Sequence, residues 1–165
     1  MVFKGRAWKF GNDITTDHIT PSRYMHLRSN LAELAKHTLE DLRPEFPSSV
    51  KLGDVIVAGK NFGAGSSREH APTVIKMLGV SAIVAESFAR IFYRNAINIG
   101  LPLLICDTSS IKDGDLIEVD LQGSTVRDLT NGVEMRFKPL SEEMLKILSE
   151  GGIVNYVKKY GDLKF

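Results

Sequence analysis

Two hydroxyl groups and a guanidinium stand side by side at Ser66, Ser67 and Arg68, directly after a turn that contains Gly63 and Gly65. An apolar, strand-like run (residues 55–58) precedes this segment, and a helix-like run (residues 71–78) follows it. A glycine-rich turn between a strand and a helix gathers backbone N–H groups, and the helix N-terminus favours negative charge at the same point. Such dipoles, together with the Arg68 guanidinium, can stabilise a serine alkoxide. The segment therefore predicts an oxyanion-binding site with Ser66 as a candidate base. Alternatively, Arg68 clamps a substrate carboxylate.

The same segment also has a purely structural interpretation. Ser66 and Glu69 have the spacing of a capping box, in which Ser66 is the N-cap of the helix and Glu69 reaches back to it. The two glycines would then supply turn dihedrals only. A capping box does not require Ser67 or Arg68, so these additional groups favour a functional site. A dinucleotide-binding fingerprint is a weaker alternative, because Arg68 stands where its third glycine is needed.

Residues 10–30 contain two further polar groups. A carboxylate next to an imidazole at Asp17 and His18 can form an acid–base pair. Adjacent side chains often point apart, however, and local evidence favours a Thr-capped or Asx turn. Arg23, His26 and Arg28 alternate with apolar residues and would suit a substrate with a carboxylate at one end and an apolar group at the other. From spacing alone, a solvated loop is the favoured interpretation.

A fourth group lies in residues 90–98, where apolar positions at helical spacing alternate with Arg90, Arg94, Asn95 and Asn98. Arg90 and Arg94 are four residues apart and share a helix face. The periodicity favours a helix whose main role is packing over a catalytic one.

The elements around these residues alternate between strand and helix. Strands are expected at residues 3–8, 55–58, 82–85 and 103–106, and helices at residues 31–42, 67–78 and 88–97. Ser87 is the expected N-cap of the last helix, and Pro44 and Pro47 return the chain to a loop after the first. Short buried strands separated by helices are typical of parallel βαβ units. The stretch of residues 10–30 is expected to be irregular, which in a compact domain is often functional.

The last third of the chain changes character. Strands are expected at residues 115–121, 125–129 and 133–138, and Asn131 with Gly132 marks a hairpin turn between the last two. A helix then starts at Ser141, and an amphipathic tail covers residues 153–160. We therefore predict a single α/β domain over residues 1–165, with a mixed sheet made of a parallel core and antiparallel additions.

Composition excludes several classes of function. The net charge of +1 offers no electrostatic argument for nucleic acid or an anionic membrane. No apolar stretch is long enough to span a bilayer, and the first residues lack the apolar core of a signal peptide. Cys106 is the single cysteine, which excludes an internal disulfide and a cysteine-ligated cluster or zinc site built by this chain alone. We expect a cytoplasmic protein with no metal site of its own.

Together these segments resemble the small subunits of isopropylmalate isomerase and homoaconitase, the family of the swivelling C-terminal domain of aconitase. The resemblance covers about residues 4 to 155 and is carried by DITTDHI (residues 13–19), NFGxGSSRE (residues 61–69) and SFARIFYRNAINxG (residues 87–100). It implies a swivelling β/β/α three-layer domain. Lengths of this order are typical of the free-standing small subunit.

The resemblance also implies roles for individual residues. Ser66 matches the base that removes a proton from the carbon alpha to a carboxylate, and Ser67 and Arg68 match groups that bind the substrate. Asp17 matches an active-site carboxylate that orients an acid–base group of the partner. Arg28 is the candidate for a substrate-binding arginine in the preceding loop, with Arg23 as the alternative.

The reaction that the resemblance implies is the isomerisation of a hydroxy acid by dehydration and rehydration. A [4Fe–4S] cluster acts there as a Lewis acid, and its cysteines would belong to a separate large subunit. The implied substrate is isopropylmalate, in leucine biosynthesis, which the apolar residues Tyr24, Met25 and Leu27 favour. Homoaconitase, in lysine or 2-oxoacid biosynthesis, is the close alternative. A non-catalytic anion-binding domain is the alternative from another class.

Overall fold

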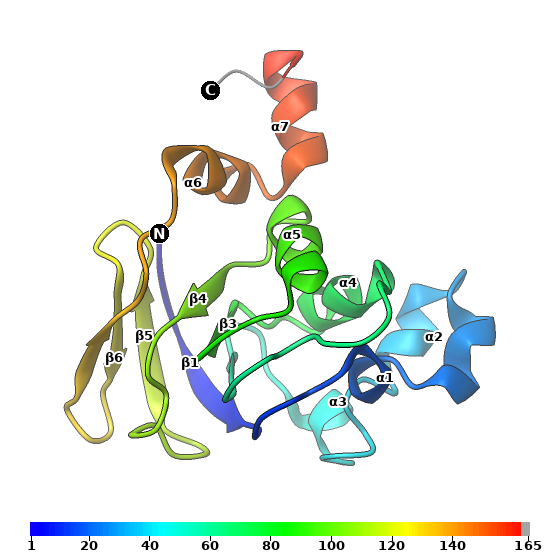
Figure 1. Cartoon of the computed structure of the whole chain (residues 1–165), viewed down its shortest axis with the longest axis horizontal. Helices are drawn as coiled ribbons and strands as arrows, with labels where there is room; N and C mark the ends of the chain where they lie inside the picture. The colour runs from blue at the N-terminus through cyan, green and yellow to red at the C-terminus, as the bar shows by residue number, and fades with distance from the viewer. Residues whose placement is uncertain (163–165) are drawn as a thin grey trace.

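One mixed sheet of seven strands organises residues 1–162, the part of the chain that the computed structural model describes (Figure 1). The strands are β1 (Val2–Lys9), β2 (Val55–Val57), β3 (Ala82–Ala85), β4 (Leu103–Ile105), β5 (Leu116–Asp120), β6 (Thr125–Asp128) and β7 (Glu134–Arg136). Their order in the sheet is β4-β3-β2-β1-β5-β6-β7. Strands β1 to β4 pair in parallel with one another, whereas β5 pairs antiparallel with β1 and β6, and β7 pairs antiparallel with β6. The predicted parallel core with antiparallel additions is confirmed.

Strand β1 joins the two halves of the sheet, because residues 2–6 pair with β5 and residues 7–9 pair with β2. Side chains of the parallel strands alternate between two cores, as the two-residue period of a strand requires. Ile56 and Ile83 belong to the core beneath the helices, whereas Val57 and Val84 belong to a second core shared with Val119 of the antiparallel half. Figure 1 shows β5 and β6 on one side of β1 and helices α1 to α5 on the other. The β/β/α three-layer architecture is therefore confirmed.

The helical segments are α1 (Thr16–Ile19), the 3-10 helix η1 (Ser22–Leu27), α2 (Leu31–Ala35), α3 (Phe46–Ser49), α4 (His70–Met77), α5 (Arg90–Asn98), α6 (Glu142–Ser149) and α7 (Ile153–Tyr160). Helices α6 and α7 form a lobe at one end of the molecule (Figure 1). Among residues 1–162, no helix has the length and apolar character needed to cross a membrane. The single domain expected over residues 1–165 includes residues 163–165, which lie outside this described part.

The segment before β2 differs from the prediction. Residues 10–30 are not irregular throughout, because they contain α1 and η1. The helix expected over residues 31–42 ends at Ala35, and residues 36–42 form turns. Leu39 has a left-handed φ of 58°, and its N–H donates to the carbonyl of Ile19 at 3.2 Å. Leu39 is fully buried, so the periodicity identified core positions correctly, but a long-range contact ended the helix.

Pro47 does not leave the chain in a loop either, since it lies in the first turn of α3, where its missing N–H costs nothing.

Helices α4 and α5 begin later than expected, at His70 and Arg90. The N-cap of α4 is Glu69, without a side-chain cap, so the alternative interpretation of Ser66 as part of a capping box is wrong. Ser87 is not the N-cap of α5 either, because that position is Ala89; its hydroxyl instead accepts a hydrogen bond from the N–H of Asn61 at 2.7 Å. Both serines lie in loops that are held by contacts with neighbouring loops: Ser66 contacts Thr16, and Ser87 contacts Asn61. By contrast, the cap predicted at Ser141 is confirmed.

A buried pair of carboxyl groups joins β5 to the hairpin turn. Asp128 is fully buried, and its Oδ1 accepts from the N–H groups of Thr130 and Asn131. Burial and the adjacent Asp115 raise the pKa of Asp128, whereas the bonds from Asp128 and from the Lys112 N–H lower the pKa of Asp115. Two carboxyl groups can share a hydrogen bond only if one of them is protonated. Folding therefore favours the protonated form of Asp128.

We predict that Asp128→Asn stabilises the protein at neutral pH, because an amide supplies its own hydrogen to Asp115. Because the pKa of Asp128 is raised on folding, its favourable contribution to the free energy of unfolding is present at low pH and is lost as the pH rises through that pKa. A gain of about 1 kcal/mol would raise Tm by about 2–4 °C at pH 7, with a smaller gain at pH 4. Thermal melts of wild type, Asp128→Asn and the control Asp120→Asn across this range would test it. An equal Tm difference at all pH values would contradict it.

Candidate active site

The candidate residues lie in loops that follow three neighbouring parallel strands. Residues 10–15 follow β1, residues 58–69 follow β2 and residues 86–89 follow β3. Because parallel strands end at the same edge of a sheet, their following loops meet there, where α/β proteins commonly bind ligands. Single β-bridges join Thr15 to Ala64 and Phe62 to Phe88. The three segments singled out in the sequence are therefore brought together at this edge.

Two glycines let the loop of residues 58–69 lie close to its neighbours. Gly63 has a φ of 88°, and a Cβ atom there would stand 2.3 Å from Cγ of Phe92. Gly65 has a φ of 105°, and its Cβ atom would stand 3.3 Å from Oγ1 of Thr16. Other residues adopt such dihedrals only at an energetic cost. The Gly63 N–H also donates to the carbonyl of Ile14 at 2.6 Å, so the loop is held on both sides.

Ser66 is positioned by helix α1. The N–H of Thr16 donates to the carbonyl of Ala64 at 2.8 Å, and the Thr16 hydroxyl donates to the carbonyl of Ser66 at 2.9 Å. The two hydroxyl oxygens of Thr16 and Ser66 are 3.5 Å apart. The N–H groups of Ser66 and Ser67 donate to no residue among residues 1–162. Two exposed hydroxyls and two uncommitted amides thus lie together, an arrangement suited to an anion.

Arg68 is anchored from η1 and α1. Its Nη1 donates to Oδ1 of Asp17 at 3.1 Å and to the carbonyl of Thr20, and its Nη2 donates to the Ser22 hydroxyl at 2.9 Å. Only 18% of the Arg68 side chain is exposed, against 60% for Asp17. Hydrogen bonds from the hydroxyl and N–H of Ser22, and then from Arg68, lower the pKa of Asp17. Asp17 is therefore an ionised group that fixes the guanidinium beside Ser67.

Asp17 and His18 do not form an acid–base pair with each other. The N–H of Thr15 donates to Nδ1 of His18 at 2.9 Å, and the N–H of His18 donates to the Thr15 hydroxyl at 3.1 Å. These reciprocal bonds cap helix α1. The Thr-capped turn that was the favoured alternative for this motif is confirmed.

A cavity of about 220 Å³ opens at this edge and is called the Ser66 cavity below. It is lined by Thr16, Gly63, Gly65, Ser66, Ser67, Arg68, Ala89, Arg90, Ile91, Phe92 and Asn95. The packing role predicted for residues 90–98 is correct for Phe92, which is buried. Arg90 and Asn95, however, line the cavity, and Thr16 was not considered as a site residue at all. Sequence reasoning missed Arg90 although it follows strand β3, whose carboxyl end must lie beside that of β2.

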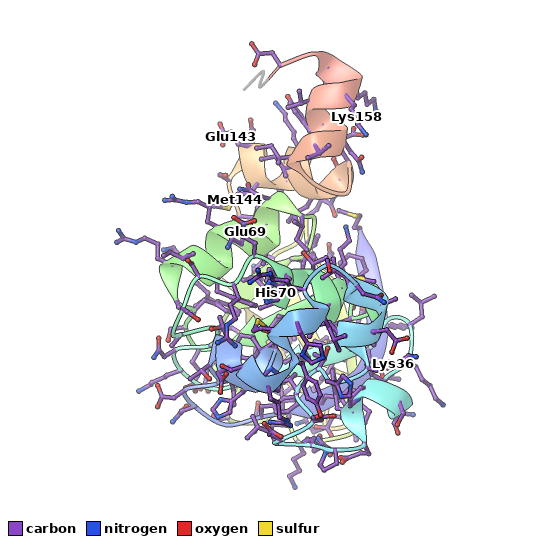
Figure 2. All side chains as sticks on the ribbon, turned by 90° about the vertical axis from the view of Figure 1, so that its right-hand side faces the viewer. Lys36, Glu69, His70, Glu143, Met144 and Lys158 are labelled. Carbon is purple, nitrogen blue, oxygen red and sulfur yellow. The ribbon has the colours of Figure 1, made fainter. Side chains whose placement is uncertain are left out.

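The two loop arginines are placed differently. Arg23 is bound by Asp41 and Glu40, with distances of 2.6 to 3.0 Å, outside the Ser66 cavity. Arg28 is exposed, and its guanidinium makes no hydrogen bond within residues 1–162. It lies near enough to His70 to lower the pKa of that imidazole, together with burial, the largest cause, and Arg68. Figure 2, which views the molecule from the side on which α1 and α2 lie, shows His70 near the middle of the view. Arg28 therefore borders the site without lining the cavity itself.

The donor groups of this chain do not suit a metal cluster. Residues 1–162 contain no group of three or more His, Cys, Asp or Glu side chains that could hold a metal ion. Cys106 is buried, and burial raises the pKa of its thiol to about 11. A single buried cysteine does not provide the set of thiolates that an iron–sulfur cluster requires.

Comparisons with known proteins show what this chain is similar to. Residues 22–107 match the family described as "Aconitase C-terminal domain". The chain is 65% identical, over 99% of both sequences, to "3-isopropylmalate dehydratase small subunit 2" of Archaeoglobus fulgidus. It is 54% identical, over 96% of this chain and 92% of the other, to "Methanogen homoaconitase small subunit" of Methanothermobacter thermautotrophicus. A crystal structure of a 3-isopropylmalate dehydratase chain from Methanocaldococcus jannaschii superimposes with a TM-score of 0.93 at 47% identity, covering 98% of this chain and 96% of that one.

Proposed function

This chain belongs to the aconitase C-terminal domain family, and from that premise we propose that it is the small subunit of a 3-isopropylmalate dehydratase, a hydro-lyase that acts with a large subunit. One observation carries the chemical part of the proposal: Ser66, Ser67 and Arg68 line one cavity beside two uncommitted backbone N–H groups. A hydroxyl next to amide dipoles and a guanidinium suits proton abstraction beside a carboxylate. A purely structural loop would not require this arrangement.

In the proposed reaction, the Ser66 alkoxide removes a proton from the carbon alpha to a substrate carboxylate. The hydroxyl group on the neighbouring carbon leaves as water after taking up a proton, and a carbon–carbon double bond forms. Water then adds back with its hydroxyl and hydrogen on exchanged carbons, which yields the isomer. The free N–H groups of Ser66 and Ser67 stabilise negative charge on the alkoxide or on the adjacent carboxylate.

The other residues bind and orient. Arg68 and Ser67 bind a substrate carboxylate, and Asp17 contributes by holding the Arg68 guanidinium at 3.1 Å and by orienting an acid–base group of the partner. Arg28 approaches the part of the substrate that extends toward His70. Arg23 is less suited to that role, because Asp41 already occupies its guanidinium.

The cluster that the family implies would be carried by the large subunit, where it supplies Lewis-acid chemistry at the substrate hydroxyl. This chain contributes the Ser66 cavity, and the pair forms a hetero-oligomer acting on a small hydroxy acid. We further propose a cytoplasmic location, since a reduced Cys106 and an iron–sulfur partner are both suited to a reducing compartment.

We predict that the purified chain alone does not hydrate isopropylmaleate, and that activity arises when a cysteine-bearing large subunit of the same family is added. The reason is that this chain supplies a base and anion-binding groups, but residues 1–162 offer no ligand set for a cluster. The measurement is hydration activity at increasing ratios of large to small subunit, with the large subunit alone as the control. Turnover by this chain alone would contradict the divided site. An inactive mixture that retains its brown iron–sulfur colour would favour a non-catalytic anion-binding domain.

The second candidate, homoaconitase activity, is favoured by the 54% identity to a methanogen homoaconitase small subunit. Its substrate carries an additional carboxylate in place of the isopropyl group. Tyr24, Met25 and Leu27 are half-buried and pack on the core beneath the helices, whereas Arg28 is exposed. The exposed cation is therefore the group available to a longer, charged side chain.

We predict a preference for isopropylmalate, because a carboxylate buried against apolar residues without a partner is costly. Arg28→Ala should leave kcat/KM for isopropylmalate within about threefold and lower it for homoaconitate about tenfold or more. The measurement is kcat/KM for both substrates on the assembled enzyme, with Arg23→Ala as the matched control. A wild-type preference for homoaconitate that disappears in Arg28→Ala would show that the substrate assignment is wrong.

A further inference from the structure

Among the described residues, the side chains that line the Ser66 cavity include two cations and no carboxylate. The cations are Arg68 and Arg90, which come from different loops, after β2 and after β3. The substrate of the proposed function carries two carboxylates. An enzyme that binds it therefore gains from two positive groups that are not neutralised by the protein itself.

Arg68 is largely neutralised within the chain. Its Nη1 donates to Asp17 and to the carbonyl of Thr20, and its Nη2 donates to Ser22. Asp17 is ionised, because the bonds from Ser22 and Arg68 lower its pKa. The ion pair of Arg68 and Asp17 carries no net charge, so it compensates little of the charge of a dicarboxylate.

Arg90 is not neutralised by any described group. Its guanidinium is exposed and makes no hydrogen bond or ion pair within residues 1–162. It also borders two neighbouring grooves, one of which contains Lys138 and the other Arg94. Neither groove is lined by an aspartate or glutamate among the described residues. Arg90 therefore has cations but no counter-ion around it.

The position of Arg90 in the fold also suits a residue that binds the substrate. It is the first residue of α5, and the preceding loop is tied to the Ser66 loop, since the N–H of Ala89 donates to the carbonyl of Phe62 at 2.9 Å. Phe92, two residues further on, packs directly beneath Gly63. The backbone that carries Arg90 is thus fixed relative to the backbone that carries Ser66. A guanidinium on such a support can hold a planar carboxylate with two parallel bonds.

We infer that Arg90 is a substrate-binding residue that pairs with the carboxylate of the hydroxy-dicarboxylic acid not held by Ser67 and Arg68. The inference rests on the proposed function for its substrate, and adds a residue to the site. In this assignment, Arg68 is held in place and neutralised by Asp17. Arg90 provides the uncompensated positive charge that binds the substrate carboxylate.

The test compares wild type, Arg90→Gln and Arg90→Lys in the assembled complex. Arg94→Gln is the matched control, because Arg94 lies one turn further along α5, is exposed and does not line the Ser66 cavity. Three quantities are measured: the binding of malate as a dicarboxylate probe by calorimetry, KM and kcat with isopropylmalate, and the dissociation constant between the subunits. Thermal melts monitor folding.

We expect Arg90→Gln to weaken malate binding and raise KM by about 10–100-fold, with a smaller change in kcat. Arg90→Lys should recover part of this loss, because the charge is kept while the two parallel bonds are lost. Arg94→Gln should change neither quantity by more than about twofold, the level typical of exposed substitutions. None of the variants should alter subunit assembly.

Two results would overturn the inference. One is unchanged malate affinity in Arg90→Gln. The other is a weaker subunit association with a normal KM at saturating large subunit, which would make Arg90 a contact to the partner. Failure of the proposed function looks different, because the wild-type complex would then not turn over isopropylmalate. Malate binding would still report on Arg90 in that case.

Discussion

Ser66→Ala should lower kcat of the assembled enzyme by about 10²–10⁴-fold, because it removes the hydroxyl proposed to take the substrate proton, while the neighbouring Ser67 is assigned to substrate binding. The hydroxyl of Thr16, 3.5 Å from that of Ser66, is buried and already donates to the carbonyl of Ser66. Folding should be nearly unaffected. Ser66 does not cap helix α4, its side chain is exposed, and within residues 1–162 its hydroxyl contacts only that of Thr16, at 3.5 Å. We expect a loss of stability of less than about 0.5 kcal/mol.

The measurement combines single-turnover kinetics with thermal melts on the same preparations. Ser67→Ala is the matched comparison, because it removes the neighbouring exposed hydroxyl while its backbone N–H stays in place. It should affect KM more than kcat, since that residue is proposed to bind and not to transfer a proton. A kcat for Ser66→Ala within about tenfold of wild type would exclude Ser66 as the base.

Arg68→Lys should reduce kcat/KM by about 100-fold, although the charge is conserved. The guanidinium bonds three groups from two nitrogens, namely Asp17, Thr20 and Ser22. An ammonium group cannot reproduce this planar fork, and a shift of about 1 Å in a substrate-binding group costs about that factor. Asp17 is mostly exposed, so losing the ion pair should change stability by about 1 kcal/mol or less.

Arg23→Lys provides a control of the same chemistry. Arg23 also bonds a carboxylate through both terminal nitrogens, at 2.9 and 2.6 Å to Asp41, but it lies outside the Ser66 cavity. This variant should keep kcat/KM within about twofold of wild type. Equal losses in both variants would mean that general destabilisation, and not the site, explains the effect of Arg68.

Local patterns predicted the strands well. Residues 82–85 were expected as a strand and form β3 over the same residues, and residues 55–58 contain β2. Short apolar runs bounded by turns are recognisable because each strand is buried on both faces. Helix starts were predicted less well. The Ser66 and Ser87 caps were wrong because both residues take part in contacts between the loops after β1, β2 and β3.

For the site, sequence reasoning selected Ser66, Ser67 and Arg68, and the structure places all three on one cavity. Their catalytic and binding roles stay predictions until the variants are measured. The resemblance to the aconitase family, rather than periodicity, supplied these roles and the iron–sulfur partner. The family membership itself is confirmed by relatives that match nearly the whole chain.

The sequence by itself determined the order of the strands, the parallel core and the segment that bears the proposed base. These depend on apolar periods and turn residues within short stretches of chain. Only the tertiary structure decided which arginine meets the cavity. Arg90 and Arg94 look alike in sequence, but strand order β3-β2-β1 places the start of α5 beside the Ser66 loop and directs the next turn elsewhere. The α5 start and the Ser66 loop lie side by side because strands far apart in the chain pair with each other. A local sequence pattern does not predict such pairing.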